Sequence, residues 1–298
     1  MKIVITGGTG LVGQHLTRLL LAKGHEVAHL SRTKRSGEIA TYAWDIENQF
    51  IEEGALSDVD ALIHLAGSGI ADGRWTAKRK RIIFDSRIKS TELLLNTLKE
   101  TDNRIKNVVA ASAIGFYGME TGDALQMEDS PAGNDFLAEV VTQWEKSSAQ
   151  FRDLGIKTTQ LRIGIVLDKK GGALGKMTTP LKLGLGSPLG SGNQWMSWIH
   201  IDDLCKMITF SMEQGLDDVY NAVAPNPATN ADLTKALAQS LGKPLFMPNV
   251  PGFALRLALG EMASLVLGGN NVSSEKISKS RFQFDYPHLD GALKNIFG

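Results

Sequence analysis

The chain has 298 residues, of which 43% are hydrophobic and 21% charged. A chain of this size and composition can bury a sizeable core, which excludes disorder as its dominant state. Its 32 Lys and Arg residues balance 32 Asp and Glu residues, so no net charge drives binding to a nucleic-acid backbone or an anionic membrane.

The sequence carries no sign of export. A strand-like run, KIVIT, follows Met1 directly, without a basic segment, an apolar segment or a cleavage site. The apolar stretch 255–267 is interrupted by Arg256 and Glu261 and is too short to cross a bilayer. The single cysteine, Cys205, cannot form an intramolecular disulfide and lies on an apolar helical face that is typical of core. We expect a cytoplasmic monomer or homodimer that binds neither nucleic acid nor membrane.

In chain order, short apolar runs alternate with helix-period segments through the first two-thirds of the sequence. This alternation predicts βαβ units and a doubly wound parallel sheet of the Rossmann type. We expect strands at 2–6, 26–30, 41–44, 61–65, 107–111 and 157–162, and helices at 11–23, 76–99 and 135–152.

After Arg162 the regular pattern gives way to a glycine-rich stretch, 171–192, which reads as a long loop over a cleft. This stretch is either a mobile lid or an ordered loop whose glycines serve tight turns. Further elements are a strand at 196–201, a helix from Asp202, a strand near 219–221, a helix at 230–241 and a final strand, turn and helix over 282–297. We expect a Rossmann domain over 1–165, with returning elements at about 196–222. A smaller, substrate-side lobe comprises 166–195 and 223–298.

The strongest local signal is TGGTGLVG, which follows the first strand and opens the first helix. In a dinucleotide site the first glycine permits a tight turn, the second lets the backbone approach a pyrophosphate, and the third lets the helix pack closely on the strand. The helix N-terminus then offers unpaired N–H groups to the phosphates. The residues assigned to this site are Gly7, Thr9, Gly10, Leu11, Val12 and Gly13.

The second strand ends in Ser31 and Arg32 where an NAD-binding protein would carry an acidic residue. A carboxylate at this position binds the ribose 2′-hydroxyl of NAD, whereas an arginine suits the 2′-phosphate of NADP. We therefore expect NADP(H) as cofactor, although Arg32 is also compatible with a solvated surface charge.

With these residues in view, the chain resembles the short-chain dehydrogenase/reductase superfamily in its extended, sugar-nucleotide-epimerase-like branch. The motifs are HLAG at 64–67, Arg87 with STELL, SAIGFYG at 112–118, Leu161-Arg162 and WIHIDDL at 198–204. GGALGKM, LGLGSPLGSG and FQFDYPHLDGALK are similar to one atypical subgroup, the epimerase family proteins called SDR39U or YfcH-like, which have their own C-terminal domain. The resemblance implies further cofactor contacts at Asp45, Leu65, Ala66, Gly67, Arg87 and Ile165.

The resemblance also implies a catalytic site, and here the sequence departs from the pattern. Extended enzymes carry Tyr-x-x-x-Lys on the helix after the fifth strand, where the lysine lowers the phenol pKa for proton transfer. The tyrosine position falls on Leu137, or on Phe136 with a shift of one, and the lysine position on Val141. Ser112 remains in place of the serine that binds the reacting oxygen, and Tyr117 is the nearest phenol.

Other polar residues near the expected cleft have two readings each. His64 is a proton carrier or hydrogen-bonded core, and His200 ahead of Asp202 is typical of a cap and turn. The acidic residues Glu120, Asp123, Glu128 and Asp129 either rim the cleft or form a solvated loop. Asp72, Arg74 and Trp75 either meet substrate or anchor a loop. No His, Cys and carboxylate set has metal-binding spacing, so we expect no metal site.

Two functional hypotheses follow. One is an NADP(H)-dependent oxidoreductase or epimerase that acts on an unknown small or nucleotide-linked substrate, with Ser112 and Tyr117 as candidate catalytic residues. The other is a non-catalytic module that senses NADPH or binds a protein partner, for example in cell division. Under either hypothesis, we expect the ligand to bind beyond the carboxyl ends of the strands, beside the nicotinamide end of the cofactor.

Overall fold

The structure, a computed structural model, describes residues 1–34 and 37–298. Its main feature is an eight-stranded sheet in the order β12-β8-β6-β5-β1-β2-β3-β4, in which only the β3–β4 pairing is antiparallel. The strands are β1 (Lys2–Thr6), β2 (Glu26–Ser31), β3 (Ala40–Asp45), β4 (Phe50–Ile51), β5 (Ala61–His64), β6 (Asn107–Ala113), β8 (Lys157–Ile163) and β12 (Val219–Ala222). The strand order reverses between β1 and β5, which is where doubly wound sheets bind ligands.

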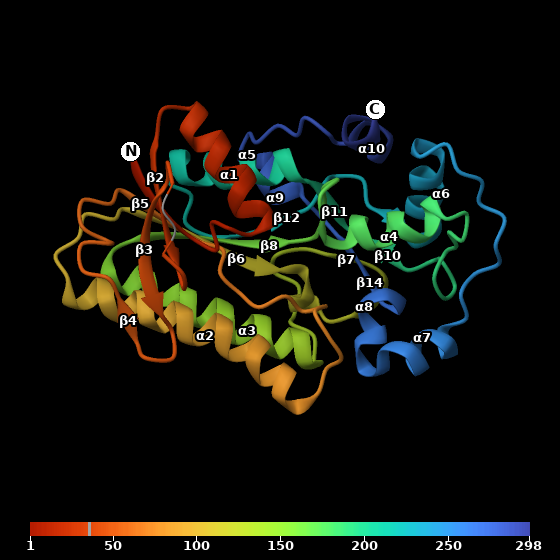
Figure 1. The fold of residues 1–298 in the computed structure, drawn as a ribbon, viewed down its shortest axis with the longest axis horizontal. Helices are drawn as coiled ribbons and strands as arrows, with labels where there is room; N and C mark the ends of the chain where they lie inside the picture. The colour runs from red at the N-terminus through yellow and green to blue at the C-terminus, as the bar shows by residue number, and fades with distance from the viewer. Residues whose placement is uncertain (35–36) are drawn as a thin grey trace.

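Helices cover both faces of this sheet (Figure 1). Ile3 and Ile5 of β1 pack toward α1 (Leu11–Ala22) and α5 (Ile201–Gln214). Val4, between them, packs on the other face toward α2 (Ala77–Glu100); α3 (Phe136–Ala149) lies beside α2. Because both faces are buried, the strands are continuous apolar runs, and the predicted Rossmann fold is confirmed.

Local signals explain where the helices begin. Thr76 accepts a hydrogen bond from the backbone N–H of Arg79 and caps α2, while Asp135 caps α3 through the N–H groups of Leu137 and Ala138. A cap was predicted at the start of α5, and the residue that forms it is His200. Its Nδ1 accepts a hydrogen bond from the N–H of Asp202 at 3.1 Å. Short 3-10 turns follow β6 (η1, Ile114–Tyr117) and α3 (η2, Gln150–Leu154).

A smaller lobe lies at the carboxyl end of the large sheet (Figure 1). It contains a four-stranded sheet, β13-β10-β14-β7, made of β7 (Glu120–Gln126), β10 (Trp195–Met196), β13 (Ala228–Thr229) and β14 (Gly269–Val272). A parallel pair joins β9 (Ile165–Leu167) to β11 (Trp198–His200). The helices of this lobe are α4 (Gly172–Lys182), α6 (Asn230–Ser240), α7 (Gly252–Leu259), η3 (Gly260–Ala263), α8 (Ser264–Leu267) and α10 (Leu289–Phe297). Helix α9 (Glu275–Lys279) instead packs through Ile277 on the core of the large sheet beside α5. Trp198, fully buried, centres the core of this lobe among α4, α6 and α10.

Three expectations for the chain beyond Ser112 were wrong. The glycine-rich stretch contains α4, because Leu174, Met177 and Leu181 supply an apolar helical face that the glycines obscure in the sequence. The acidic segment after Ser112 is strand β7, which pairs with β14 from the far end of the sequence. The final segment has no strand at 282–286 and forms only helix α10.

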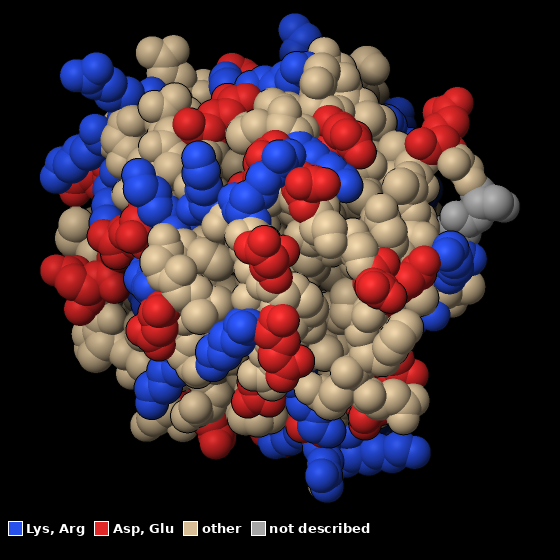
Figure 2. Space-filling model, turned by 90° about the vertical axis from the view of Figure 1, so that its left-hand side faces the viewer, with Lys and Arg blue, Asp and Glu red and all other residues tan. Residues whose placement is uncertain are grey.

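The surface is consistent with the charge balance of the sequence. Lys and Arg side chains alternate with Asp and Glu side chains over the face seen in Figure 2. Within the described residues, no helix combines the length and apolarity that a membrane crossing requires.

Candidate functional site

The glycine turn after β1 has the geometry of a phosphate-binding loop. Gly7 has φ of 72°, and a Cβ there would lie 2.9 Å from the carbonyl carbon of Leu65. A Cβ on Gly13 would collide with the carbonyl oxygen of Gly7, so α1 packs against the turn. Gly10 is the N-cap of α1 and no side chain caps the helix, which leaves the N–H groups that follow Gly10 free to bind an anion.

The end of β5 is fixed to this turn by buried polar contacts. Thr6 Oγ1 lies 2.7 Å from Nδ1 of His64, and the N–H of Ala66 donates to the same oxygen at 3.2 Å. Nε2 of His64 lies 3.1 Å from Thr91 Oγ1. Complete burial lowers the pKa of His64 to about 4, so the ring is neutral at physiological pH. His64 is hydrogen-bonded core that positions Leu65, Ala66 and Gly67 beside the glycine turn.

A cavity of about 370 Å³ continues the cleft from the end of β2. Arg32 and Asp45, both assigned from the sequence, line it, but both Asp45 oxygens accept hydrogen bonds from the turn 47–48, which lowers the pKa of the carboxyl group. Its opposite wall is one face of α2, which sequence reasoning missed although the residues recur at helical spacing. These residues are Lys78, Arg81, Ile82, Asp85 and Ser86.

Arg87, one residue beyond this wall, has no acidic partner among residues 1–34 and 37–298. Its Nη1 donates to the carbonyl oxygens of Ser68 and Ile83, at 3.1 and 2.9 Å, and its Cζ lies 5.0 Å from the centre of the Trp144 ring. A Cβ on Gly67 would lie 3.3 Å from Cζ, so the guanidinium borders the strand end that was assigned to the cofactor. Burial, and secondarily the charge of Arg79, lowers the pKa of Arg87 to about 10.

Ser112 lies on β6, is 3% exposed, and donates to Glu145 Oε1 at 2.5 Å. The same carboxylate accepts two hydrogen bonds from Arg162, from Nε at 2.8 Å and from Nη2 at 2.9 Å. Burial lowers the pKa of Arg162, but its hydrogen bond and attraction to Glu145 outweigh burial and raise it overall. The proton of the Ser112 hydroxyl is therefore committed to a buried ion pair.

Tyr117 belongs to the same network. Its hydroxyl donates to Asn221 Oδ1 at 2.6 Å and accepts from Arg162 Nη1 at 3.0 Å. Burial raises the pKa of Tyr117, and the nearby Arg162 only partly offsets that effect. The structure thus gives Ser112 and Tyr117 one connected set of protein partners, and their catalytic roles stay predictions.

The residues that the resemblance aligns with a tyrosine-lysine pair have apolar side chains. Leu137 and Val141 are 6% and 3% exposed, and the Cβ of Leu137 lies 3.5 Å from where a Cβ of Gly115 would stand. Phe136 stacks edge-on against Trp75 at 5.3 Å, and Lys80 Nζ lies 4.9 Å from its ring centre. Among these side chains, only the Lys80 ammonium and the Trp75 indole carry exchangeable protons. The indole N–H donates to the carbonyl oxygen of Ile70.

The loop 67–75 connects the cleft to the smaller lobe. Arg74 donates to the carbonyl oxygens of Leu257 and Ala258 at the end of α7. It therefore anchors the loop, which is one of the two roles that the sequence suggested for it. Lys176 of α4 donates to the carbonyl oxygen of Ala71 at 3.0 Å. The beginning of α4 also lies against the side chain of Leu11, which brings the glycine-rich segment over the phosphate turn.

Ile165, the remaining residue assigned to the cofactor, begins β9, and its N–H donates to the carbonyl oxygen of Ser197 at 2.9 Å. It is half-buried and packs against the core of the smaller lobe, at the junction between the two lobes. No contact with the phosphate turn or the Arg32 cavity is recorded for Ile165 among the described residues, so its role as a cofactor contact stays a prediction.

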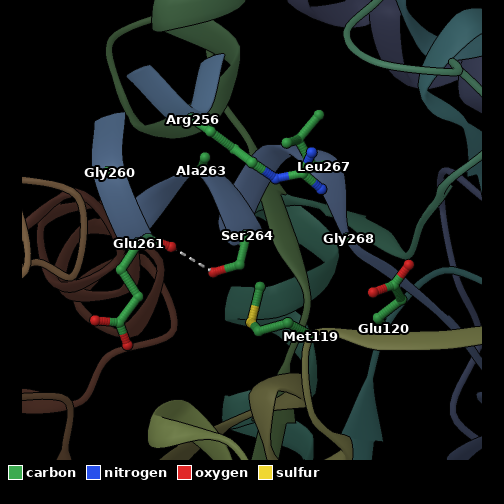
Figure 3. Close-up of a pocket in the computed structure, with 9 residues that line it drawn as sticks. All are labelled: Met119, Glu120, Arg256, Gly260, Glu261, Ala263, Ser264, Leu267 and Gly268. Carbon is green, nitrogen blue, oxygen red and sulfur yellow. Dashed lines mark hydrogen bonds between the residues drawn. The ribbon is translucent and has the colours of Figure 1, made fainter. Parts of the chain in front are cut away.

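A second cavity, of about 400 Å³, lies in the smaller lobe between the start of β7 and the segment from α7 to α8 (Figure 3). Sequence analysis assigned none of its residues to a site. Glu261 points away from Arg256 and Glu120 and forms an ion pair with Lys80 of α2 at 2.5 Å (Figure 3). The lining residues are Met119, Glu120, Arg256, Gly260, Glu261, Ala263, Ser264, Leu267 and Gly268.

Metal and thiol chemistry find no support in the described part of the chain. It holds no group of three or more His, Cys, Asp or Glu side chains arranged to bind a metal ion. Cys205 is 2% exposed, and its burial raises the pKa of the thiol, so it is core on α5 as its sequence position indicates.

Comparison with known proteins covers the whole chain. Residues 3–144 match the NAD dependent epimerase/dehydratase family, and residues 250–296 match a domain of unknown function, DUF1731. The chain is 37% identical to epimerase family protein YfhF of Bacillus subtilis, covering 99% of this chain and 98% of that protein. It is 35% identical to human epimerase family protein SDR39U1, covering 99% of both.

A solved structure agrees with this relationship. The crystal structure of human epimerase family protein SDR39U1 (isoform 2) with NADPH superposes with a TM-score of 0.90, at 33% identity and 99% coverage of both chains. A UDP-glucose 4-epimerase from Thermotoga maritima, at 20% identity and a TM-score of 0.78, shares the fold.

Proposed function

Because this chain belongs to the SDR39U1-like epimerase family proteins, of the NAD dependent epimerase/dehydratase family, we propose that it binds NADP(H) without proton transfer by a tyrosine-lysine pair. One observation carries the proposal: the phosphate turn is intact while the proton-transfer position is packed with Leu137 and Val141. The cofactor site is therefore retained and the chemistry beside it is not.

The residues present fit a dinucleotide with an extra phosphate. The free N–H groups at the start of α1 suit the pyrophosphate, and Arg32 suits the 2′-phosphate at the end of β2. Crystallisation of human SDR39U1 with NADPH, at 33% identity over the whole chain, supports the same choice of cofactor. Bound there, the nicotinamide would supply a hydride, and this chain would hold it beside β6.

The groups around that position do not favour acid-base chemistry. The Ser112 hydroxyl donates its one hydrogen bond to Glu145 and so has none left to donate to a reacting oxygen. Burial raises the pKa of Tyr117 and lowers that of His64, which leaves both side chains neutral and hydrogen-bonded to protein. The proposal therefore gives Ser112, Tyr117 and His64 structural roles.

A second candidate function is catalysis on a nucleotide-linked substrate. Its support is a solved nucleoside-diphosphate sugar epimerase from Corynebacterium glutamicum, 30% identical with a TM-score of 0.80, of which this chain spans 58%. In that case Ser112 would have to leave Glu145 and turn to the substrate oxygen.

Calorimetry with NADPH and NADH, followed by absorbance assays with carbonyl compounds and UDP-sugars, tests the proposal. We expect NADPH to bind at least tenfold more tightly than NADH and its absorbance to stay constant with every substrate. Equal affinities would refute the NADP assignment. Substrate-dependent loss of absorbance, or epimerised product, would establish the second candidate instead.

A further inference from the structure

The helix α7 is attached to the rest of the molecule mainly by polar contacts. None of its residues is buried, and Phe253 and Leu257 are 73% and 82% exposed. Surface helices of globular proteins are usually fixed by an apolar face that packs on the core. Burial of apolar side chains therefore contributes little to holding α7 on the rest of the molecule.

The polar contacts of this segment converge on one region of the Rossmann domain. Arg74 reaches the last turn of α7, where its Nη2 lies 2.7 Å from the carbonyl oxygen of Ala258 and 3.2 Å from that of Leu257. A cation at this end of a helix satisfies free carbonyl groups and opposes the helix dipole. Two residues past α7, Glu261 pairs with Lys80 in the first turns of α2.

The segment that receives these contacts is part of the cofactor cleft. Arg74 lies near the end of the loop 67–75, whose first residues, Gly67 and Ser68, border the Arg87 guanidinium, and Ser68 also lines the Arg32 cavity. The carbonyl oxygen of Gly69 accepts a hydrogen bond from Arg79, and the N–H of Ser68 donates to Ser86 Oγ at 3.0 Å. Both partners, Arg79 and Ser86, lie on α2. A ligand that orders residues 67–68 therefore acts on the same short loop that holds α7.

We propose that the C-terminal domain, the region of unknown function at 250–296, acts as a clamp on the cofactor cleft, closed by Arg74 on α7 and by Lys80 on Glu261. This inference rests on the proposed binding of NADP(H). In the closed form, α7 and η3 are held against the end of loop 67–75 and the start of α2 by these two contacts. Cofactor binding and clamp closure favour each other, because the two events share one loop.

Arg74 and Lys80 are positioning residues in this clamp, since both act through α7 and η3. Their contacts are partly exposed to solvent, so added salt weakens the Lys80–Glu261 pair. The carbonyl contacts of Arg74 depend less on salt. Opening of the clamp in the cofactor-free protein should therefore rise with ionic strength, and less so in a Lys80→Gln variant.

Hydrogen exchange of the full chain, with and without saturating NADPH, tests the clamp. In the unaltered protein we expect NADPH to protect the phosphate turn 7–13 and, in addition, residues 252–268. In Arg74→Ala and Lys80→Gln we expect protection of 7–13 to persist at saturation, while residues 252–268 exchange about tenfold faster than in the unaltered protein. Glu275→Gln is the matched control, because its exposed pair with Lys279 lies within the C-terminal domain and does not contact the loop.

The outcomes separate the clamp from the proposed function. Protection of 7–13 without any change at 252–268 would overturn the clamp and leave cofactor binding intact. Absence of protection at 7–13 would refute NADP(H) binding itself. If Arg74→Ala fails to fold, Arg74→Lys serves, because an ammonium lacks the planar fork by which Nε and Nη2 of Arg74 both reach the carbonyl oxygen of Ala258.

Discussion

Two arginines near the cleft, Arg162 and Arg87, differ in the groups that neutralise their positive charge. Arg162 makes two hydrogen bonds to Glu145 and one to Tyr117, so the protein itself satisfies it. Arg87 has carbonyl partners and the Trp144 ring but no carboxylate. A partly buried cation without a counter-ion is costly unless a ligand supplies the negative charge. Arg162 is therefore structural, and Arg87 is set for an anionic ligand.

Arg32 and Arg87 should affect cofactor binding differently. Arg32 follows β2, whereas Arg87 borders the end of β5, on the other side of β1. Adjacent strands are about 4.8 Å apart, so the two guanidinium groups face different phosphates. We expect Arg32→Ala to weaken NADPH binding about ten- to a hundredfold and to leave NADH unchanged. We expect Arg87→Gln to weaken both cofactors alike, through the pyrophosphate.

Calorimetry of both variants with both cofactors checks this expectation. Arg104→Gln is the control, because Arg104 is an exposed arginine paired with Asp58 and Asp60, away from the cleft. Loss of NADPH affinity alone in Arg87→Gln would instead place Arg87 at the 2′-phosphate.

His64 should make stability depend on pH. Its folded pKa of about 4 lies below the unfolded value of 6.5, so between these values the unfolded chain binds the proton and the folded chain does not. The contribution of neutral His64 is complete above pH 6.5 and is lost as pH falls toward 4. The loss amounts to about 2 kcal/mol at pH 5.

Urea unfolding at pH 7.5 and pH 5 measures this loss. In His64→Gln, the free energy of unfolding should be lower at pH 7.5 but should fall less between the two pH values. An identical fall in both proteins would show that His64 does not titrate in this window.

At the scale of elements, α3 shows how one helix can keep its place and lose its chemistry. Its cap, Asp135, and its buried residues, Leu137 and Val141, fix it against η1 and β6. A tyrosine and a lysine at these positions would have to lie in the space that now packs on Gly115. The helix is thus committed to packing in the region where extended enzymes transfer a proton.

Restoring the pair should not restore an enzyme. In Leu137→Tyr with Val141→Lys, the lysine would be buried without a partner and would lose its charge or destabilise the fold. We expect the melting temperature to fall by several degrees, at about 2–4 °C per kcal/mol for a chain of this size, and no turnover of UDP-sugars. Leu137→Tyr alone is the control for bulk. Turnover by the double variant, absent from the parent, would show an epimerase site that lacked only its base.

Across the whole molecule, the sequence predicts what depends on local pattern. Seven of the eight strands of the large sheet, and the glycine turn, are continuous local segments that were predicted at their positions, whereas the two-residue strand β4 was not predicted. Pairing of β7 with β14 joins segments about 150 residues apart, and ETGDALQ is too polar to read as a strand. The contacts of Ser112 with Glu145, and of Arg74 with Leu257, likewise depend on the folded chain.

The glycine-rich segment 171–192 gives the last prediction. Its ordered helix α4 lies against Leu11, one residue past the cap of α1, and Lys176 holds the loop at Ala71. Phosphates bound at Gly10 and Leu11 would steady the surface on which α4 rests. We therefore expect NADPH to slow hydrogen exchange in 171–182 together with the phosphate turn, as a closing lid would. If the turn 7–13 gains protection and 171–192 does not, the segment with α4 is not a lid, and its glycines outside the helix serve tight turns.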